Sequence, residues 1–177
     1  MTRHLLAALA LPLALGACGG SKSDMDDVTS AYCPQPMTVS DAQRLVRFRD
    51  GPGRDPRDIV FEAVIAPGGV GCTRRTSQMD VDMEVRIVVT AGPAVGTAPV
   101  NVPYFVRVLD ASGQVVQGQD FIADFRLTPA SPRAGSKEEL TLRLPFQQLS
   151  DVAAYRIAVG LKPTQEELQY NRRSTAR

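Results

Sequence analysis

The chain has 177 residues, with 20 Lys and Arg against 19 Asp and Glu, and a formal net charge of +1. This near-zero balance argues against a dedicated nucleic-acid binder, and the length suits one domain with a substantial core. The only histidine is His4, and there is no tryptophan. Removal of the first 17 residues, argued for below, leaves 160 residues with no histidine and 19 charges of each sign. This excludes a Ser-His-Asp triad, a Cys-His dyad, a histidine-bound zinc site and a His-ligated haem, and we expect no cofactor.

The N-terminus carries a short apolar run, Leu5 to Leu15, behind Arg3 and His4. As a helix this run rises about 16 Å, roughly half the hydrocarbon core of a bilayer, so it is too short to span a membrane. A basic start, a short apolar stretch and small residues before a cleavage point are typical of a secretory signal. We therefore expect residues 1–17 to be a signal peptide.

The signal ends in Leu15-Gly16-Ala17-Cys18, which resembles the lipobox of bacterial lipoproteins. The resemblance implies that the Cys18 thiol carries a diacylglyceryl group, which anchors the protein to a membrane on its periplasmic side. Gly19, in place of an aspartate, favours the outer membrane over the inner one. The alternative is an ordinary cleaved signal in which the cysteine is accidental. Residues 18–32 are small and polar, and we expect a lipidated N-terminus and flexible tether.

With Cys18 assigned to lipid, Cys33 and Cys72 remain as an even pair in an oxidising compartment. A disulfide between them is the default expectation there. The alternative is a redox-active pair, but the spacing is unlike CxxC and no basic residue adjoins Cys33. A structural bridge is therefore favoured.

Alternation of apolar and polar residues is the dominant pattern in the rest of the chain. It is cleanest over residues 79–90, where one side of the predicted strand is entirely apolar. Similar runs separated by turn residues lie at 59–66, around Cys72, and at 104–109, 115–127, 140–144 and 154–161. About seven short strands, each with one buried face, predict an all-β, antiparallel β-sandwich over residues 33–170.

The segment Asp151-Val152-Ala153-Ala154-Tyr155 resembles the lead-in to the tyrosine corner of immunoglobulin-like domains. Ile157 stands where an antibody domain has cysteine, and the core tryptophan is absent. The resemblance thus implies an immunoglobulin-like sandwich that is not a true antibody domain.

Short helical turns are expected on either side of the sheets. Ser40-Asp41-Ala42-Gln43 has capping-box spacing and predicts a short helix or irregular turn before the first strand. Thr164-Gln165-Glu166-Glu167 has the same spacing and predicts a last helical turn through Tyr170. Residues 171–177 are expected to form a basic C-terminal tail.

Two charged segments are candidate sites. Asp80, Asp82 and Glu84 share one strand face and would suit calcium or acid–base chemistry, but neither a calcium loop nor aromatic sugar platforms accompany them. We interpret them as a solvated face with cross-strand arginine partners such as Arg74, Arg75 or Arg107. Residues 47–58 alternate basic and acidic residues; we interpret them as a solvated loop, with contact to anionic headgroups or to a partner as the alternative.

The stretch from Leu161 to Arg172 resembles the end of a set of small alphaproteobacterial lipoproteins, although Lys162-Pro163 departs from their usual reading. The resemblance extends to Cys33-Pro34, 58–63 and 103–106. Those proteins have no assigned activity, so the resemblance implies class and location and supplies no chemistry. The candidate interaction residues in this stretch are Tyr170, Asn171, Arg172 and Arg173; the alternative is that Leu168 and Tyr170 merely close the end of the sandwich.

These observations predict a non-catalytic envelope lipoprotein that acts through contact with an envelope protein. We expect no metal site, no catalytic residue and no nucleic-acid partner. The alternative is a periplasmic carrier of an apolar or lipid ligand, bound between the sheets or at the sandwich mouth. An enzyme that uses carboxylates alone is the third reading.

Overall fold

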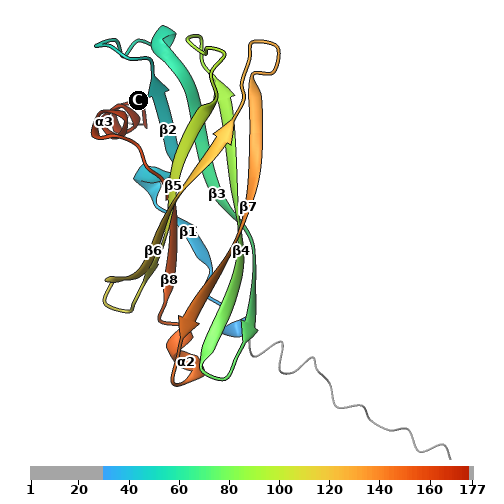
Figure 1. The fold of residues 1–177 in the computed structure, drawn as a ribbon. Coiled ribbons are helices and arrows are strands. Elements are labelled where there is room, and N and C mark those ends of the chain that lie inside the picture. The colour runs from blue at the N-terminus through green and yellow to red at the C-terminus, as the bar shows by residue number, and fades with distance from the viewer. Residues whose placement is uncertain (1–29, 176–177) are drawn as a thin grey trace, which may run out of the picture.

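The computed structural model describes residues 30–175, so the predicted signal peptide, Cys18 and most of the predicted tether lie outside the described residues. The protein is an all-β sandwich of two four-stranded sheets (Figure 1), which confirms the predicted fold class. One sheet has the order β1 (Pro36–Thr38), β8 (Arg156–Leu161), β5 (Val100–Leu109), β6 (Val115–Phe125). The other has the order β2 (Arg44–Phe48), β3 (Ile59–Arg74), β4 (Gln78–Ala91), β7 (Arg133–Pro145).

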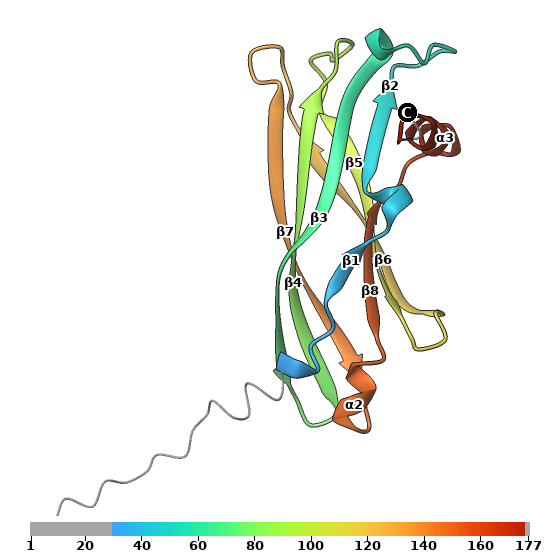
Figure 2. The ribbon, with the colours of Figure 1, turned by 180° about the vertical axis from the view of Figure 1, so that it is seen from behind.

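The strand connections are those of an immunoglobulin-like Greek key. Consecutive strands β4 and β5 lie in different sheets, and the later pair β7 and β8 returns so that β7 pairs with β4 and β8 with β5. Just before β8, the Tyr155 hydroxyl donates a 3.0 Å hydrogen bond to the Pro145 carbonyl oxygen, as a tyrosine corner does. β1 pairs with β8 in parallel, and the other neighbouring strands are antiparallel (Figure 2).

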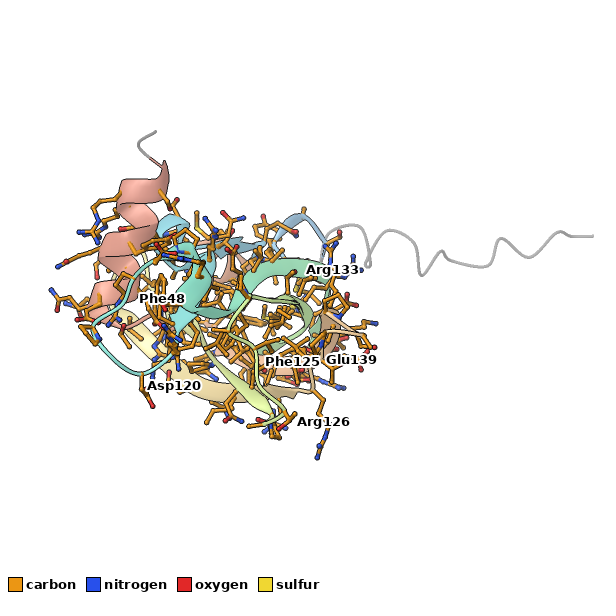
Figure 3. All side chains as sticks on the ribbon, turned by 90° about the horizontal axis from the view of Figure 1, so that it is seen from above. Phe48, Asp120, Phe125, Arg126, Arg133 and Glu139 are labelled. Atoms are coloured by element: carbon orange, nitrogen blue, oxygen red, sulfur yellow. A yellow bond between two sulfur atoms is a disulfide. The ribbon has the colours of Figure 1, made fainter. Side chains whose placement is uncertain are left out.

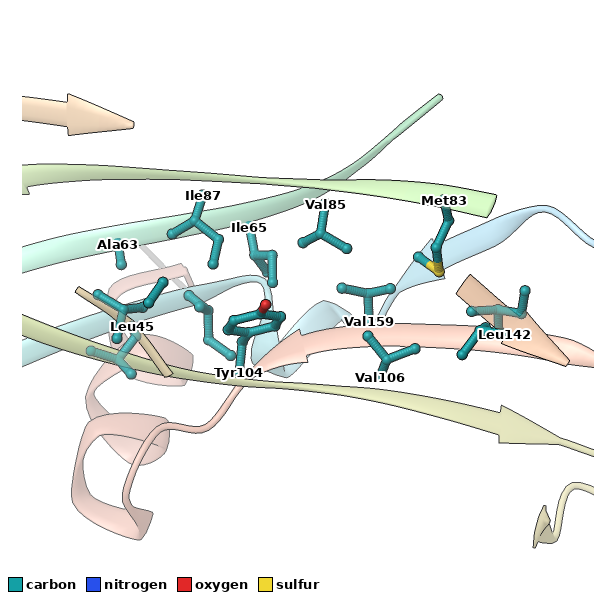
Figure 4. Close-up of a cluster of buried hydrophobic side chains, with 14 of the residues drawn as sticks. Leu45, Ala63, Ile65, Met83, Val85, Ile87, Tyr104, Val106, Leu142 and Val159 are labelled. Carbon is teal, nitrogen blue, oxygen red and sulfur yellow. The ribbon is translucent and has the colours of Figure 1, made fainter. Parts of the chain in front are cut away.

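The core lies between the sheets because each strand turns its apolar face inward (Figure 4). The predicted alternation is clearest in β4, where the inward residues are almost fully buried: Met79, Val81, Met83, Val85, Ile87 and Val89. Facing them from the other sheet are Val102, Tyr104, Val106, Val108, Ile157, Val159 and Leu161.

The turn residues between the predicted strand runs at 59–66 and around Cys72 do not interrupt the strand. Pro67-Gly68-Gly69 lies within β3, which runs without interruption from Ile59 to Arg74. The register against β4 shifts between Pro67 and Val70, which marks a β-bulge. The glycines accommodate the bulge: a Cβ at Gly68 would lie 2.7 Å from the Glu84 carboxylate.

The helical segments differ from expectation in detail. The 3₁₀ turn η1 (Ser40–Ala42) follows Val39 as N-cap, and no side chain caps it, so the predicted Ser40 capping box does not form. A second 3₁₀ turn, η2 (Pro56–Asp58), and a short helix, α2 (Leu149–Val152), connect strands. The last helix, α3 (Gln165–Thr175), begins where predicted but continues past Tyr170, so residues 171–175 of the predicted basic tail belong to the helix.

The two ends of the sandwich are different. At one end the Cys33–Cys72 disulfide, with Cα atoms 5.7 Å apart, joins the start of the described chain to β3, near the β3–β4 turn. Figure 1 shows α3 and the 49–58 loop at the opposite end. With 16 residues in β3, the strands span about 50 Å. Among the described residues, no helix is long and apolar enough to cross a membrane.

Candidate interaction site at the α3 end

The start of α3 is fixed by the predicted capping box. The Glu167 carboxylate accepts a 2.7 Å hydrogen bond from the Thr164 backbone N–H, and the Thr164 hydroxyl accepts one from the Glu167 N–H at 3.3 Å. Glu167 is 4% exposed, and its charge is paired with Arg47 of β2 at 2.5 Å. A buried carboxylate needs such partners, so this pair anchors the helix to the strand.

The middle of α3 packs across β2 (Figure 3). The rings of Phe48 and Tyr170 meet edge to face with centroids 4.9 Å apart. Asn171 is buried and donates a 2.7 Å hydrogen bond to the Arg44 carbonyl oxygen. These contacts cover the face of β2 that points away from the core between the sheets.

The four predicted interaction residues therefore separate into different environments. Tyr170 and Asn171 hold the helix in place, and Arg172 forms an ion pair with Asp41 at 2.5 Å. Arg173 is exposed, and no ion pair involves it within residues 30–175. With Arg54, Tyr170 and Ser174, it lines an open cleft of about 460 Å³.

Arg54 is a member of this site that the sequence did not single out. Its guanidinium lies 5.4 Å from the Phe48 ring centroid, donates to the Gly51 and Gly53 carbonyl oxygens at 2.9 and 2.6 Å, and pairs with Glu166 of α3. The charge alternation over 47–58 was the available signal, but pairing with α3 is visible only in three dimensions. A second cleft of about 260 Å³ opens beside Arg54, between the 49–51 turn and the start of α3.

The row of carboxylates on β4 is paired with basic and polar neighbours. Asp80 accepts from Arg75 at 2.9 Å and from Gln78 at 2.7 Å, and these hydrogen bonds lower its pKa. Asp82 accepts from the Thr141 hydroxyl at 2.6 Å. Hydrogen bonds from Lys137 and then Arg86 lower the pKa of Glu84. Neighbouring side chains therefore engage all three carboxylates, the interpretation favoured above, and Arg75 is the predicted arginine that does pair with one of them.

The described part of the chain brings no three His, Cys, Asp or Glu side chains together in a metal-binding arrangement. The α3 end offers instead an open cleft lined by Arg173, by Arg54, whose charge Glu166 balances, and by a tyrosine and a serine hydroxyl. Such a surface suits recognition of another molecule.

Comparison with known proteins adds little to this picture. No family model matches the chain, and no curated protein matches it. Among solved structures, the chain is similar to a DUF1425 family member from Shewanella sp. pv-4, with 12% identity, 72% of this chain and 94% of that chain covered, and a TM-score of 0.33. A likeness at this level carries no argument about function. Fold and site together define a β-sandwich domain with a helix-covered, arginine-lined end.

Proposed function

We propose that the protein is a non-catalytic, membrane-anchored envelope lipoprotein that acts through protein–protein contact at its α3 end. The observation that carries the proposal is the position of the cleft relative to the start of the folded domain. The Cys33–Cys72 disulfide holds the anchor side of the chain at one end, and the Arg54–Arg173 cleft lies at the other (Figure 1). A lipid on Cys18 would thus leave the cleft facing away from the membrane.

The filled core supports contact over ligand carrying. A pocket between β6 and β7, lined by Val106, Phe121 and Leu140 among others, holds about 30 Å³. Pockets for drug-sized ligands are typically at least about 300 Å³. Side chains such as Ile65, Ile87 and Tyr104 occupy the space where an acyl chain would have to lie.

The lipid anchor is tested by metabolic labelling with a fatty acid in the producing cells. We expect label in the wild-type protein and none in a Cys18→Ser variant, because a thioether-linked lipid requires the thiol. Labelling of Cys18→Ser equal to that of the wild type would refute the anchor.

The contact surface is tested by photo-crosslinking in the same cells. Benzoylphenylalanine replaces Ser174, which lines the cleft, or Thr73, which is exposed near the disulfide as a matched control. We expect one recurrent envelope protein crosslinked from position 174 and not from position 73. A charge reversal, Arg173→Glu, should abolish this product, whereas Arg74→Glu near the disulfide should not.

Other outcomes would overturn the proposal. Identical products from both positions would mean that the α3 end has no specific partner. Mass spectrometry of extractable lipid covers the carrier alternative: near-equimolar copurifying lipid with no recurrent protein would favour a carrier.

A further inference from the structure

Among residues 30–175, the sandwich has two long strand edges on the same side with which no further strand pairs. β6 and β7 are the outer strands of their sheets there, and a small pocket lies between them. On the opposite side, α3 covers β2 and β1 has only three residues. A free edge presents unpaired backbone N–H and C=O groups to which another strand can add. β6 offers 11 residues and β7 offers 13.

We propose that these two edges are the interface of a symmetric dimer with a second copy of this chain. β6 and β7 are joined by residues 126–132 and run in opposite directions. A two-fold axis parallel to the strands therefore sets β7 of the second copy antiparallel beside β6, and β6 of the second copy beside β7. Both sheets continue across the junction, and the assembly closes at two copies.

The charges favour β6 of one copy beside β7 of the other, and disfavour β6–β6 or β7–β7 pairing. The exposed face of β6 carries Asp120 and Asp124 and no cation, whereas that of β7 carries Arg133 and Lys137 at the same spacing, followed by Glu139 and Arg143. Within one copy Asp120 already pairs with Arg107 and Lys162, and Lys137 with Glu84 and Glu139, so Asp124 and Arg133 are the charges left for a second copy. The antiparallel register that sets Asp120 opposite Lys137 also sets Asp124 opposite Arg133. Opposite charges in directly facing strand positions are stabilising, and like charges are not.

The inner face of the same register supplies neighbours for polar groups that point between the sheets. Ser136 and Glu138 occupy the partly buried positions of β7, and the Ser136 hydroxyl is buried with no hydrogen-bond partner among the described residues. In this register the Gln119 amide of the second copy lies opposite Glu138, to which it can donate. The Phe121 ring lies opposite Ser136 and adds apolar cover there, not a hydrogen bond. The edge of each sandwich is thereby covered by the other copy.

The axis also keeps both copies in the same orientation. Both Cys33 ends lie at one end of the dimer and both α3 clefts at the other, which is compatible with two anchors in one membrane. The dimer goes beyond the proposed function and does not depend on it, because it rests on the strand edges alone.

The register is tested by cysteine crosslinking between two differently tagged full-length copies in the producing cells. One copy carries Ile122→Cys and the other Gly135→Cys, which face each other in the proposed register. Ile122 is 67% exposed, and a Cβ at Gly135 meets no atom closer than 3.5 Å, so both positions tolerate the change. The control pairs Ile122→Cys with Arg143→Cys, eight residues or about 27 Å further along β7. We expect a mixed-tag disulfide for the first pair only; no disulfide, or equal yields from both pairs, would overturn the proposal.

The affinity is tested by light scattering over a concentration series of the full-length protein in detergent. Arg133→Asp should weaken the dimer about tenfold or more, because the altered pair occurs twice. Combining it with Asp124→Arg should restore the wild-type dissociation constant, which a folding defect would not do. A wild-type monomer at every concentration, or a double variant as weak as the single one, would contradict the model.

Discussion

The ring of Tyr104 lies stacked on that of Phe121, with centroids 4.9 Å apart and planes inclined by 17°. The two residues are cross-strand partners on the inner faces of β5 and β6. Tyr104 is 2% exposed, and its hydroxyl points toward the opposite sheet (Figure 4). Burial, with a smaller contribution from the Glu138 carboxylate, raises the pKa of Tyr104 to about 12.

This pKa predicts a loss of stability at alkaline pH. Below pH 10 the phenol keeps its proton in both the folded and the unfolded chain, so it makes no pH-dependent contribution. Between pH 10 and about 12 only the unfolded chain releases the proton, and the free energy of unfolding should fall by about 1.4 kcal/mol per pH unit. Urea unfolding at pH 9.5, 10.5 and 11.5 measures this fall in the free energy of unfolding. Tyr104→Phe should lack this component, and equal slopes for the two proteins would show that Tyr104 ionises normally.

The disulfide should stabilise the fold mainly by restricting the unfolded chain. Cys33 and Cys72 are 39 residues apart, which corresponds to about 4 kcal/mol in the chain-entropy model. We expect a Cys33→Ser, Cys72→Ser double variant to lose up to this amount in denaturant unfolding under oxidising conditions. Alkylation of unreduced wild-type protein provides the control: readily labelled thiols at both positions would show that the bridge does not form.

Attachment of α3 should depend on the Phe48–Tyr170 contact. Tyr170→Ala removes the edge-to-face ring pair and part of the apolar cover of β2, which should cost about 1–2 kcal/mol. Hydrogen exchange should then accelerate in α3 and along β2, but not in β4. Tyr170→Phe keeps the ring and should leave hydrogen exchange unchanged. Faster exchange in that variant would mean that the Tyr170 hydroxyl, and not the ring contact, holds α3 on β2.

The sequence indicated strands wherever one face is apolar and the other wet. That rule located β3, β4, β5, β6 and β8, but it missed β2, where Leu45 and Val46 are both buried. α3 covers the second face of β2, so the alternation is lost. The rule also missed the first half of β7, where the inward positions Ser136 and Glu138 are polar because they lie at the open edge of the sandwich.

In the candidate site too, local sequence patterns were predicted correctly and contacts between distant residues were not. The capping box at Thr164 is a local pattern and was predicted correctly, as was the disulfide. The Arg54–Phe48–Glu166 contacts join residues that are far apart in the chain, and no local pattern pairs them. Asn171 looked like part of a basic tail, yet it is buried because the helix extends one further turn over β2.

The last prediction concerns the close approach of the backbone at Gly92, just after β4, to the start of β3. Gly92 donates a 2.8 Å hydrogen bond to the Val60 carbonyl oxygen, and a Cβ on it would lie 2.6 Å from the Ile59 carbonyl carbon and 2.7 Å from Ile59 Cγ2. Gly92→Ala must therefore move the end of β4 away from the start of β3, at a cost of about 2–3 kcal/mol. Gly96→Ala, in the same loop, meets no atom within 4 Å and should leave stability unchanged or raise it by up to about 1 kcal/mol. Denaturant unfolding of both variants measures the difference, and equal stabilities would mean that the two strands do not approach this closely.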